Sequence, residues 1–241
     1  MNFNILYVSA ISVALIGECY AYDLVDEQQA ALWSNNLRII SCILMGIWFY
    51  KLQSYEFRFR QKFFTLSLLL PILVSLSTYL IPEPQAIIVN LGVNISIFII
   101  WIYYFHQLGA KICFQDSDNN FKKIIPAFLF FPLLFYFFSL YESLTRIYSI
   151  IVFIYVIIFS YTGILAVFIP LTDKRRMYVI FGFSLLVMAN IMNAYHTFLE
   201  KLFWAYPVIR IIAVASKCMF IYGIAQCSIK NLSSNKVAAD V

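Results

Sequence analysis

The chain has 241 residues, of which 63% are hydrophobic and only 12% are Asp, Glu, Lys or Arg. Soluble domains carry about 25% charged residues, so this composition excludes a water-soluble globule, which needs a polar surface. The formal net charge of +5 at pH 7 therefore does not indicate nucleic-acid binding, and what matters is which loops carry the cations. The composition predicts an all-α integral membrane protein.

Apolar runs separated by polar breaks predict eight transmembrane helices, because a bilayer core about 30 Å thick takes about 20 helical residues to cross. No Lys or Arg precedes the first run, so we expect an uncleaved helix rather than a signal peptide. No stretch is long enough or polar enough for a soluble domain, so we expect one transmembrane domain over residues 1–230 and a short polar cytoplasmic tail over 231–241. The runs lie near residues 4–21, 33–51, 63–81, 86–108, 123–141, 147–171, 177–198 and 205–229.

The cations alternate from one connection to the next. The connections that share one side, together with the tail, hold twelve of the 17 Lys and Arg residues, whereas the alternate loops hold only Arg146 and Lys201. Lys and Arg concentrate on the cytoplasmic side of membrane proteins. The pattern predicts a multi-pass protein of the inner (plasma) membrane with both termini in the cytoplasm. The twelve are Lys51, Arg58, Arg60, Lys62, Lys111, Lys122, Lys123, Lys174, Arg175, Arg176, Lys230 and Lys236.

A few polar residues lie inside the predicted spans. Lys217 is near the middle of the last span, where a cation costs at least ~2.5–3.5 kcal/mol on insertion scales. Arg210 lies two helical turns earlier on nearly the same face, and Asn190 and Asn193 share a face of the seventh span. Arg38 lies near the outer end of the second span. We predict that these side chains line a polar, cationic cavity that opens toward the outer leaflet.

Structural roles for these residues stay open beside this prediction. Arg38 and Arg210 are close enough to span ends to reach the interface with their head groups. His196 fits an interfacial residue, and the two asparagines fit hydrogen bonds between helices. Lys217 lies too deep to reach the interface easily, so it favours a cavity most strongly.

Groups that could perform catalysis are scarce. Acid–base chemistry in a membrane pocket needs a carboxylate or a His within reach of water, and Glu18 and His196 are the only candidates. The five cysteines show no CxxC pair and no His at metal-ligand spacing, so we expect no metal site, and nothing indicates a cofactor. A retinal Schiff base on Lys217 is disfavoured, because all twelve acids lie in loops or near span ends.

The last two spans resemble those of the YhhN-like family, the lysoplasmalogenase-type membrane proteins with eight spans. In that family a Gly of the seventh helix is followed by a Ser–Asp pair, an Ala and often an aromatic residue. Here Gly182 is followed at the same spacings by Ala189–Asn190, Ala194 and Phe198. The family's next helix tends to carry Tyr-x-x-Ala-Gln, which residues 222–226 match. The resemblance covers roughly 45 residues and implies an eight-helix bundle around a lipid-sized cavity.

The chain departs from this family at the acidic positions. Family members that hydrolyse the vinyl-ether bond of lysoplasmalogens are thought to use two aspartates, and the matching positions here hold Pro71 and Asn190. A Lys–Pro that opens the family's second helix falls on Arg38–Ile39, which keeps the charge. An Asn can hold water or a head group but cannot take a proton from water near neutral pH. The resemblance therefore implies either a divergent hydrolase that uses Glu18 or His196, or a lipid-binding relative without turnover.

These observations predict a pocket for a membrane lipid. Two other classes stay open: a transporter of small molecules or anions that uses Lys217 and Arg210, and a structural membrane subunit whose polar groups lock helices together. We make no prediction of the oligomeric state. The predicted lining residues are Arg38, Pro71, Asn190, Asn193, Arg210, Lys217 and Tyr222.

Overall fold

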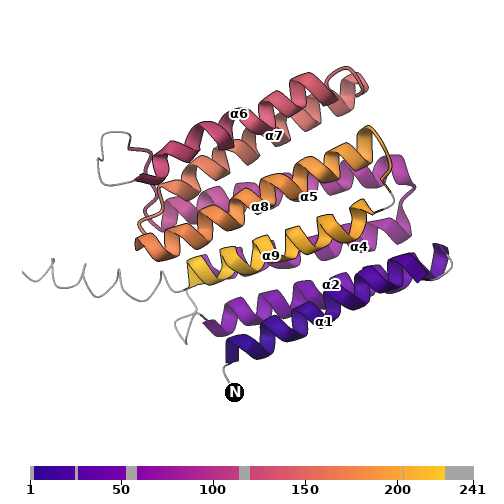
Figure 1. Cartoon of the computed structure of the whole chain (residues 1–241), viewed down its shortest axis with the longest axis horizontal. Coiled ribbons are helices and arrows are strands. Elements are labelled where there is room, and N and C mark those ends of the chain that lie inside the picture. Colours follow the sequence, from indigo (N-terminus) through magenta and orange to yellow (C-terminus); the bar gives the residue numbers. More distant parts are fainter. Residues whose placement is uncertain (1–2, 25–26, 53–58, 114–119, 203, 226–241) are drawn as a thin grey trace, which may run out of the picture.

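The computed structural model describes residues 3–24, 27–52, 59–113, 120–202 and 204–225. In these ranges the chain forms helices joined by short connections (Figure 1). The predicted tail, Gln226 and Cys227 lie outside the described residues. The elements are α1 (Phe3–Leu24), α2 (Glu27–Leu52), α3 (Phe59–Leu69), α4 (Pro71–Leu80), α5 (Glu83–Gln107), η1 (Asn120–Ile124), α6 (Ile125–Phe135), η2 (Tyr136–Leu140), α7 (Arg146–Val167), α8 (Asp173–Phe198) and α9 (Ala205–Ala225).

The predicted membrane bundle is confirmed as a fold class. Seven helical stretches of the described chain are long and apolar enough to cross a membrane. The helix α2 has the length but is more polar, because its first half contains Asn35, Asn36 and Arg38. The number of spans is therefore seven to eight, and the side on which the termini lie stays a prediction.

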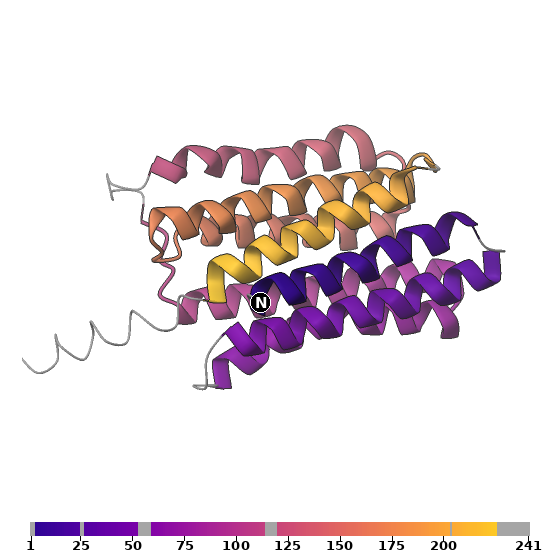
Figure 2. The same ribbon diagram turned by 60° about the horizontal axis from the view of Figure 1, so that its bottom comes forward.

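The helices form an antiparallel bundle. In Figure 1 the pairs α1–α2 and α6–α7 lie at opposite edges, with α8 and α9 between them. The view turned by 60° keeps α6 on one side of α8 and α9 and the pair α1–α2 on the other (Figure 2). The helix α5 contacts α3, α4 and α7, while α9 contacts α1, α2 and α8. Segments from both ends of the chain therefore meet around α9.

Pro71 divides the third predicted span into α3 and α4. Proline has no backbone N–H and disfavours a continuous helix, so α3 ends at Leu69 and α4 begins at Pro71 itself. The backbone N–H of Leu73 donates to the carbonyl of Leu70 at 2.9 Å across the break. This break lies beside the cavity described below.

The pair α8–α9 packs with its backbones in close approach. A Cβ added at Gly182 would lie 3.0 Å from the carbonyl oxygen of Ser216 and 3.2 Å from the backbone nitrogen of Phe220. The hydroxyl of Ser216 donates to the carbonyl oxygen of Gly182 at 2.7 Å. These contacts fix the register in which the polar residues of the two helices face the interior.

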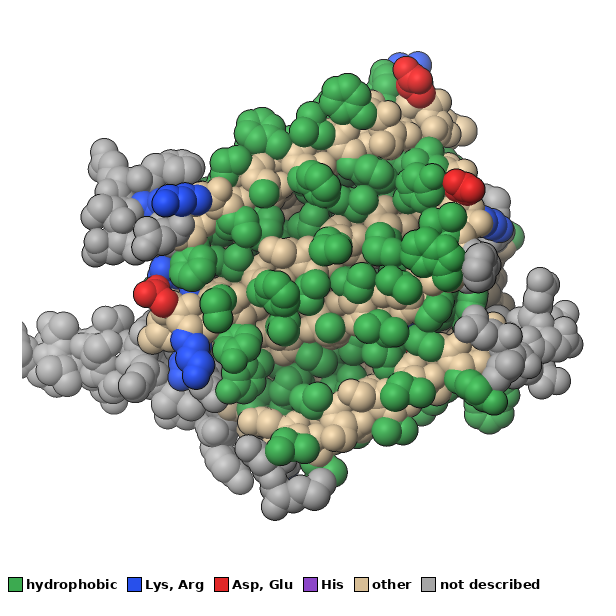
Figure 3. Space-filling view, in the orientation of Figure 1, with side chains coloured by type: hydrophobic (Ala, Val, Ile, Leu, Met, Phe, Trp, Pro, Cys, Tyr) green, Lys and Arg blue, Asp and Glu red, His purple; other side chains and the backbone are tan. Residues whose placement is uncertain are grey.

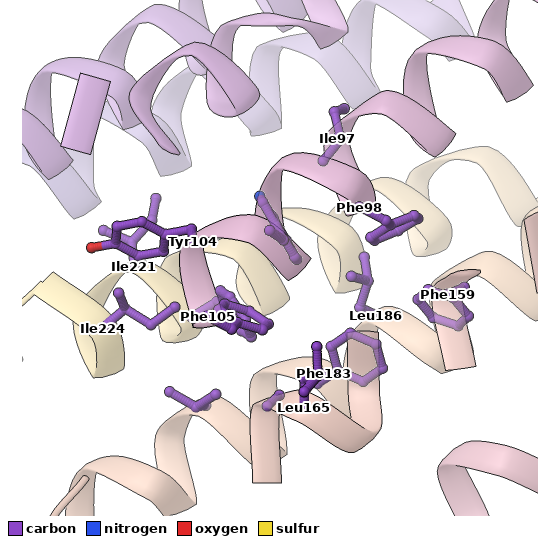
Figure 4. Close-up of a cluster of buried hydrophobic side chains, with 14 of the residues drawn as sticks. Ile97, Phe98, Tyr104, Phe105, Phe159, Leu165, Phe183, Leu186, Ile221 and Ile224 are labelled. Atoms are coloured by element: carbon purple, nitrogen blue, oxygen red, sulfur yellow. The ribbon is translucent and has the colours of Figure 1, made fainter. Parts of the chain in front are cut away.

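Aromatic side chains fill the half of the bundle that lies next to the connection between α7 and α8. Figure 4 shows this cluster, in which Phe98, Phe159 and Phe183 come from three different helices. The ring of Phe159 lies 5.0 Å from that of Phe98 and 5.0 Å from that of Phe183, centroid to centroid. The rings of Trp101 and Phe220 stack at 4.7 Å. We call this region the aromatic half.

The outer surface of the bundle is apolar. Figure 3 shows hydrophobic side chains across the visible face, with charged side chains gathered at the two ends of the helices. Phe138, Leu80 and Val13 are 85%, 81% and 70% exposed. A belt of this kind is favourable against lipid tails and unfavourable against water, which agrees with a multi-pass membrane protein.

Candidate functional site: a cationic cavity between α2, α3, α4, α5, α8 and α9

A cavity of about 190 Å³ lies inside the bundle, between α2, α3, α4, α5, α8 and α9. It occupies the half that lies next to the connection between α8 and α9, beyond the aromatic half. We call it the cationic cavity. Six of the seven predicted lining residues take part in it: Arg38, Pro71, Asn190, Asn193, Arg210 and Lys217.

Tyr222 is the predicted residue that does not reach the cationic cavity. It is 38% exposed and lies with Trp48 and Cys218 at a separate hollow between α1, α2, α8 and α9. Tyr222 follows Lys217 by five residues, which turns it about 140° around the helix axis from the lysine. The two side chains therefore point to different sides of α9.

Helical spacing explains how α9 presents its cations. Arg210, Ala213 and Lys217 line the cavity, and positions three, four and seven residues apart share one face of a helix. The two cations are separated by about 10 Å along the axis, at 1.5 Å per residue. Arg38 of α2 supplies a third cation to the same cavity.

A fully buried carboxylate from α1 lies behind the arginines. The guanidinium of Arg210 donates from Nε to Oε1 of Glu18 at 2.6 Å and from Nη2 to Oε2 at 3.0 Å. The hydroxyl of Tyr206 donates to Oε1 at 2.8 Å, and Nε of Arg38 lies 3.4 Å from the same oxygen. The Glu18 side chain is 0% exposed. One acid therefore binds two arginines and a tyrosine.

Tyr206 joins this cluster to the rest of the bundle. Its hydroxyl also accepts a hydrogen bond from Nη2 of Arg38 at 2.8 Å. Its ring stacks on Tyr22 with centroids 3.9 Å apart, and the guanidinium carbon of Arg38 lies 5.8 Å from the ring centroid. Helices α1, α2 and α9 are thereby tied together at the edge of the cavity, and the orientation of Arg38 is fixed.

Lys217 differs from the two arginines because no described side chain forms a hydrogen bond or ion pair with it. It forms no hydrogen bond or ion pair with any residue that the structure describes, although it lines the cationic cavity. The cluster contains Arg38, Arg210 and Lys217 against the single carboxylate of Glu18, so its formal charge is +2 when the lysine is protonated. A buried excess of positive charge is unfavourable unless an anion balances it.

Four asparagines form the border of the cationic cavity toward α7. They are Asn90 and Asn94 on α5, and Asn190 and Asn193 on α8. The amide of Asn94 donates to Oδ1 of Asn90 at 2.6 Å. Asn190 accepts a hydrogen bond from the hydroxyl of Tyr155 at 2.6 Å and donates to the carbonyl of Leu186 at 2.8 Å. The amides of Asn90, Asn94 and Asn190 are therefore held in place and keep further hydrogen-bonding capacity for a ligand.

The same four asparagines also line a second cavity, of about 80 Å³, between α5, α6, α7 and α8. The rest of its lining is mainly apolar, and we call it the apolar cavity. Examples of its walls are Phe135, Val152, Phe159 and Phe198. A polar, cationic space and an apolar space thus meet at a border of amides.

The two residues proposed as catalytic are both engaged by the protein. Glu18 does not line the cationic cavity, and its carboxylate accepts hydrogen bonds from two guanidinium groups, so it does not face a ligand there. His196 lines the cavity, but its Nδ1 accepts a hydrogen bond from the backbone N–H of Leu202 at 3.0 Å. In the neutral imidazole the proton then lies on Nε2, so neither nitrogen is a free base.

Some lining residues were missed by the sequence analysis. Asn90 and Asn94 are four residues apart inside one span, and this spacing alone places both on one helix face. Trp101 and Ser67 form the floor, where the indole Nε1 donates to the serine hydroxyl at 2.8 Å. No spacing in the sequence predicts the contact between Trp101 and Ser67, because these residues belong to two different helices.

Metal ligands are not grouped in the part of the chain that the structure describes: no three His, Cys, Asp or Glu side chains come together there. Comparisons with models of protein families, with curated proteins and with solved structures find no match. The resemblance to the YhhN-like family accordingly stays an expectation based on the residues of α8 and α9. The structure itself shows a helical, multi-pass type of membrane protein in which a cationic cavity adjoins an apolar cavity.

Proposed function

We propose that this protein binds a membrane lipid or related amphiphile in its two adjoining cavities and does not hydrolyse it. The observation that carries the proposal is the pairing of a cationic space with an apolar space across one row of amides. An amphiphile has the same division into a polar head and an apolar chain. A cavity for a small polar solute would not need the apolar part.

The size of the cavities favours a head group and part of one chain. Ligand pockets for drug-sized molecules measure about 300–1,000 Å³, whereas the cavities here measure about 190 and 80 Å³. The remainder of the chain would extend into the bilayer.

Binding without turnover is favoured over hydrolysis because neither of the two catalytic candidates, Glu18 and His196, offers a free base. The carboxylate of Glu18 is bound by Arg210, Arg38 and Tyr206, and Nδ1 of His196 is occupied by a backbone N–H. Asn190 and Pro71 stand where the resemblance implies acids, and neither side chain can activate water. A divergent lysoplasmalogenase-type hydrolase would have to rearrange these contacts.

The experiment is to purify the protein in a mild neutral detergent, extract it, and identify the bound lipid by mass spectrometry. In parallel, the protein is incubated with a lyso-ether lipid and the release of aldehyde is measured. The proposal predicts a lipid that co-purifies in a near-stoichiometric amount and no aldehyde above the level with buffer alone. Released aldehyde would overturn binding without turnover, and a lipid-free protein that takes up no added lipid would overturn binding itself.

Transport of such a ligand is a second candidate. It is favoured by the break between α3 and α4, because Pro71 lies in the cavity wall and interrupted helices form the substrate sites of many transporters. Reconstitution into liposomes and measurement of the movement of a labelled lipid between leaflets would separate a transporter from a binding protein.

A further inference from the structure

The charge balance of the cationic cavity narrows the class of ligand. Three basic side chains meet one acid, and this acid is already bound by both arginines. Lys217 forms no hydrogen bond or ion pair with the described part of the chain and faces the cavity. A cation in a membrane interior is stabilised by a counter-ion within a few ångströms. The ligand is therefore the natural source of the missing negative charge.

A zwitterionic or cationic head group has no matching partner in this cavity. Its quaternary or primary ammonium would need a carboxylate or an open aromatic face. Among the described residues that line the cavity there is no Asp or Glu, and Glu18 lies behind the two guanidinium groups. The aromatic lining residues offer no open ring face either. Trp101 stacks on Phe64 and Phe220, Phe98 packs against Trp101 and Phe159, and both are only 3% exposed. The ring of Tyr206 stacks on Tyr22 and lies against the guanidinium of Arg38. The three cations would in addition repel an ammonium.

The row of amides gives the ligand a direction. Asn90, Asn94, Asn190 and Asn193 line both cavities, so a molecule that occupies both must cross between them. Amides can hydrogen-bond the hydroxyl or ester oxygens that join a lipid head to its chain. Beyond them, Phe135, Val152 and Phe198 offer only apolar contacts. The head then lies at Lys217 and Arg38, and the chain lies toward α7.

We infer that the ligand is an amphiphile with a single chain and an anionic head group, a phosphate monoester or a carboxylate, whose negative charge is bound by Lys217 and Arg38. This inference rests on the proposed lipid binding and specifies its charge class. Arg210 has a different part: through Glu18 and Tyr206 it positions Arg38, and its own guanidinium is largely occupied by the carboxylate.

The test measures binding to the full-length protein in a neutral detergent by isothermal titration calorimetry. The probes are 1-oleoyl lysophosphatidate, oleate, 1-oleoyl lysophosphatidylcholine, mono-oleoyl glycerol and inorganic phosphate. The variants are Lys217→Met, Lys217→Arg and, as a matched control, Lys174→Met, because Lys174 is an exposed lysine at the start of α8. Thermal unfolding of each variant establishes that it is folded.

The inference predicts that lysophosphatidate or oleate binds at least tenfold more tightly than the zwitterionic and neutral lipids. It predicts that Lys217→Met weakens this binding roughly tenfold or more, the effect of losing one charged hydrogen bond. Lys217→Arg should retain most of the affinity, and Lys174→Met should retain all of it.

Each of the following outcomes would overturn one part of the inference. Equal binding of lysophosphatidylcholine and lysophosphatidate would overturn the anionic class and leave the proposed lipid binding intact. Binding of free phosphate as tightly as lysophosphatidate would overturn the role of the chain. If none of the four lipids binds, the inference is wrong, and the proposed function is wrong as well if no lipid co-purifies with the protein. Unchanged affinity in folded Lys217→Met would overturn the role of this lysine.

Discussion

The two halves of the bundle are built from the same helices, but one half is tightly packed and the other contains a cavity. In the aromatic half, Phe183, Phe220 and Ile224 are 0–1% exposed and fill the space between α8, α9 and their neighbours. In the other half, the same two helices present Asn190 and Lys217 to a cavity. Apolar side chains close a gap by packing, whereas amides and cations keep it open until a partner satisfies them. Within α8 and α9, the residues in the aromatic half therefore stabilise the fold, whereas the residues in the other half line the candidate site.

The largest effect is expected from Glu18→Gln, which removes the carboxylate that balances two guanidinium groups. Breaking one side of a buried ion pair destabilises proteins by about 3–5 kcal/mol, and we expect a loss of free energy of unfolding in this range. Thermal or denaturant unfolding in detergent measures it. Glu142→Gln is the matched control because Glu142 is exposed, and it should change little. A wild-type stability for Glu18→Gln would show that the ion cluster does not hold α1, α2 and α9 together.

Gly182→Ala tests the close approach of α8 and α9. The added Cβ would lie 3.0 Å from a backbone oxygen of α9, and overpacking of this kind costs about 1–3 kcal/mol. Gly92→Ala is the control, because no atom lies within 4 Å of its added Cβ; there the higher helix propensity of Ala should raise stability slightly. Comparable melting temperatures for the two variants would contradict the tight α8–α9 contact.

Lys217→Met tests the difference between the two halves, because it places in the cationic cavity an apolar side chain of the kind that fills the aromatic half. Without ligand, Lys217 is a half-buried cation that no described residue pairs with, so replacing it by an apolar side chain should raise the free energy of unfolding, by about 1 kcal/mol or more. The stabilising effect of an anionic lipid should disappear at the same time. A drop in stability would instead favour the structural role in which this lysine locks helices.

The smallest effect is expected from Tyr155→Phe, which keeps the ring and removes the hydroxyl that binds Oδ1 of Asn190. Loss of one hydrogen bond of this kind costs about 0.5–1.5 kcal/mol. Tyr161→Phe on the same helix is the control, since Tyr161 is exposed, and it should leave the melting temperature unchanged. If both substitutions behave alike, Asn190 is not held by α7.

Much of the site could be predicted from the sequence because hydrocarbon makes polar residues informative. Lys217 and Arg210 are seven residues apart in an apolar run, and the cost of exposing them to lipid leaves only the interior. The same rule applied to Asn190 and Arg38. The all-α membrane fold followed from composition and apolar run lengths alone.

The other features of the site depend on contacts between segments that are distant in the sequence. Glu18 pairs with Arg210 across 192 positions, and neither helix by itself indicates the other. Spacing along the chain therefore does not predict that Glu18 is buried in an ion cluster, and the sequence alone presents this residue as a catalytic candidate. Tyr222 was placed in the pocket by the family resemblance, although its angle around α9 relative to Lys217 points elsewhere.

Native mass spectrometry of the purified protein tests the central claim most directly, with wild type, Lys217→Met and Lys174→Met compared side by side. A lipid-binding cavity built around Lys217 predicts one bound lipid on the wild type and on Lys174→Met, and its loss from folded Lys217→Met. The same lipid in the same amount on all three proteins would contradict the account.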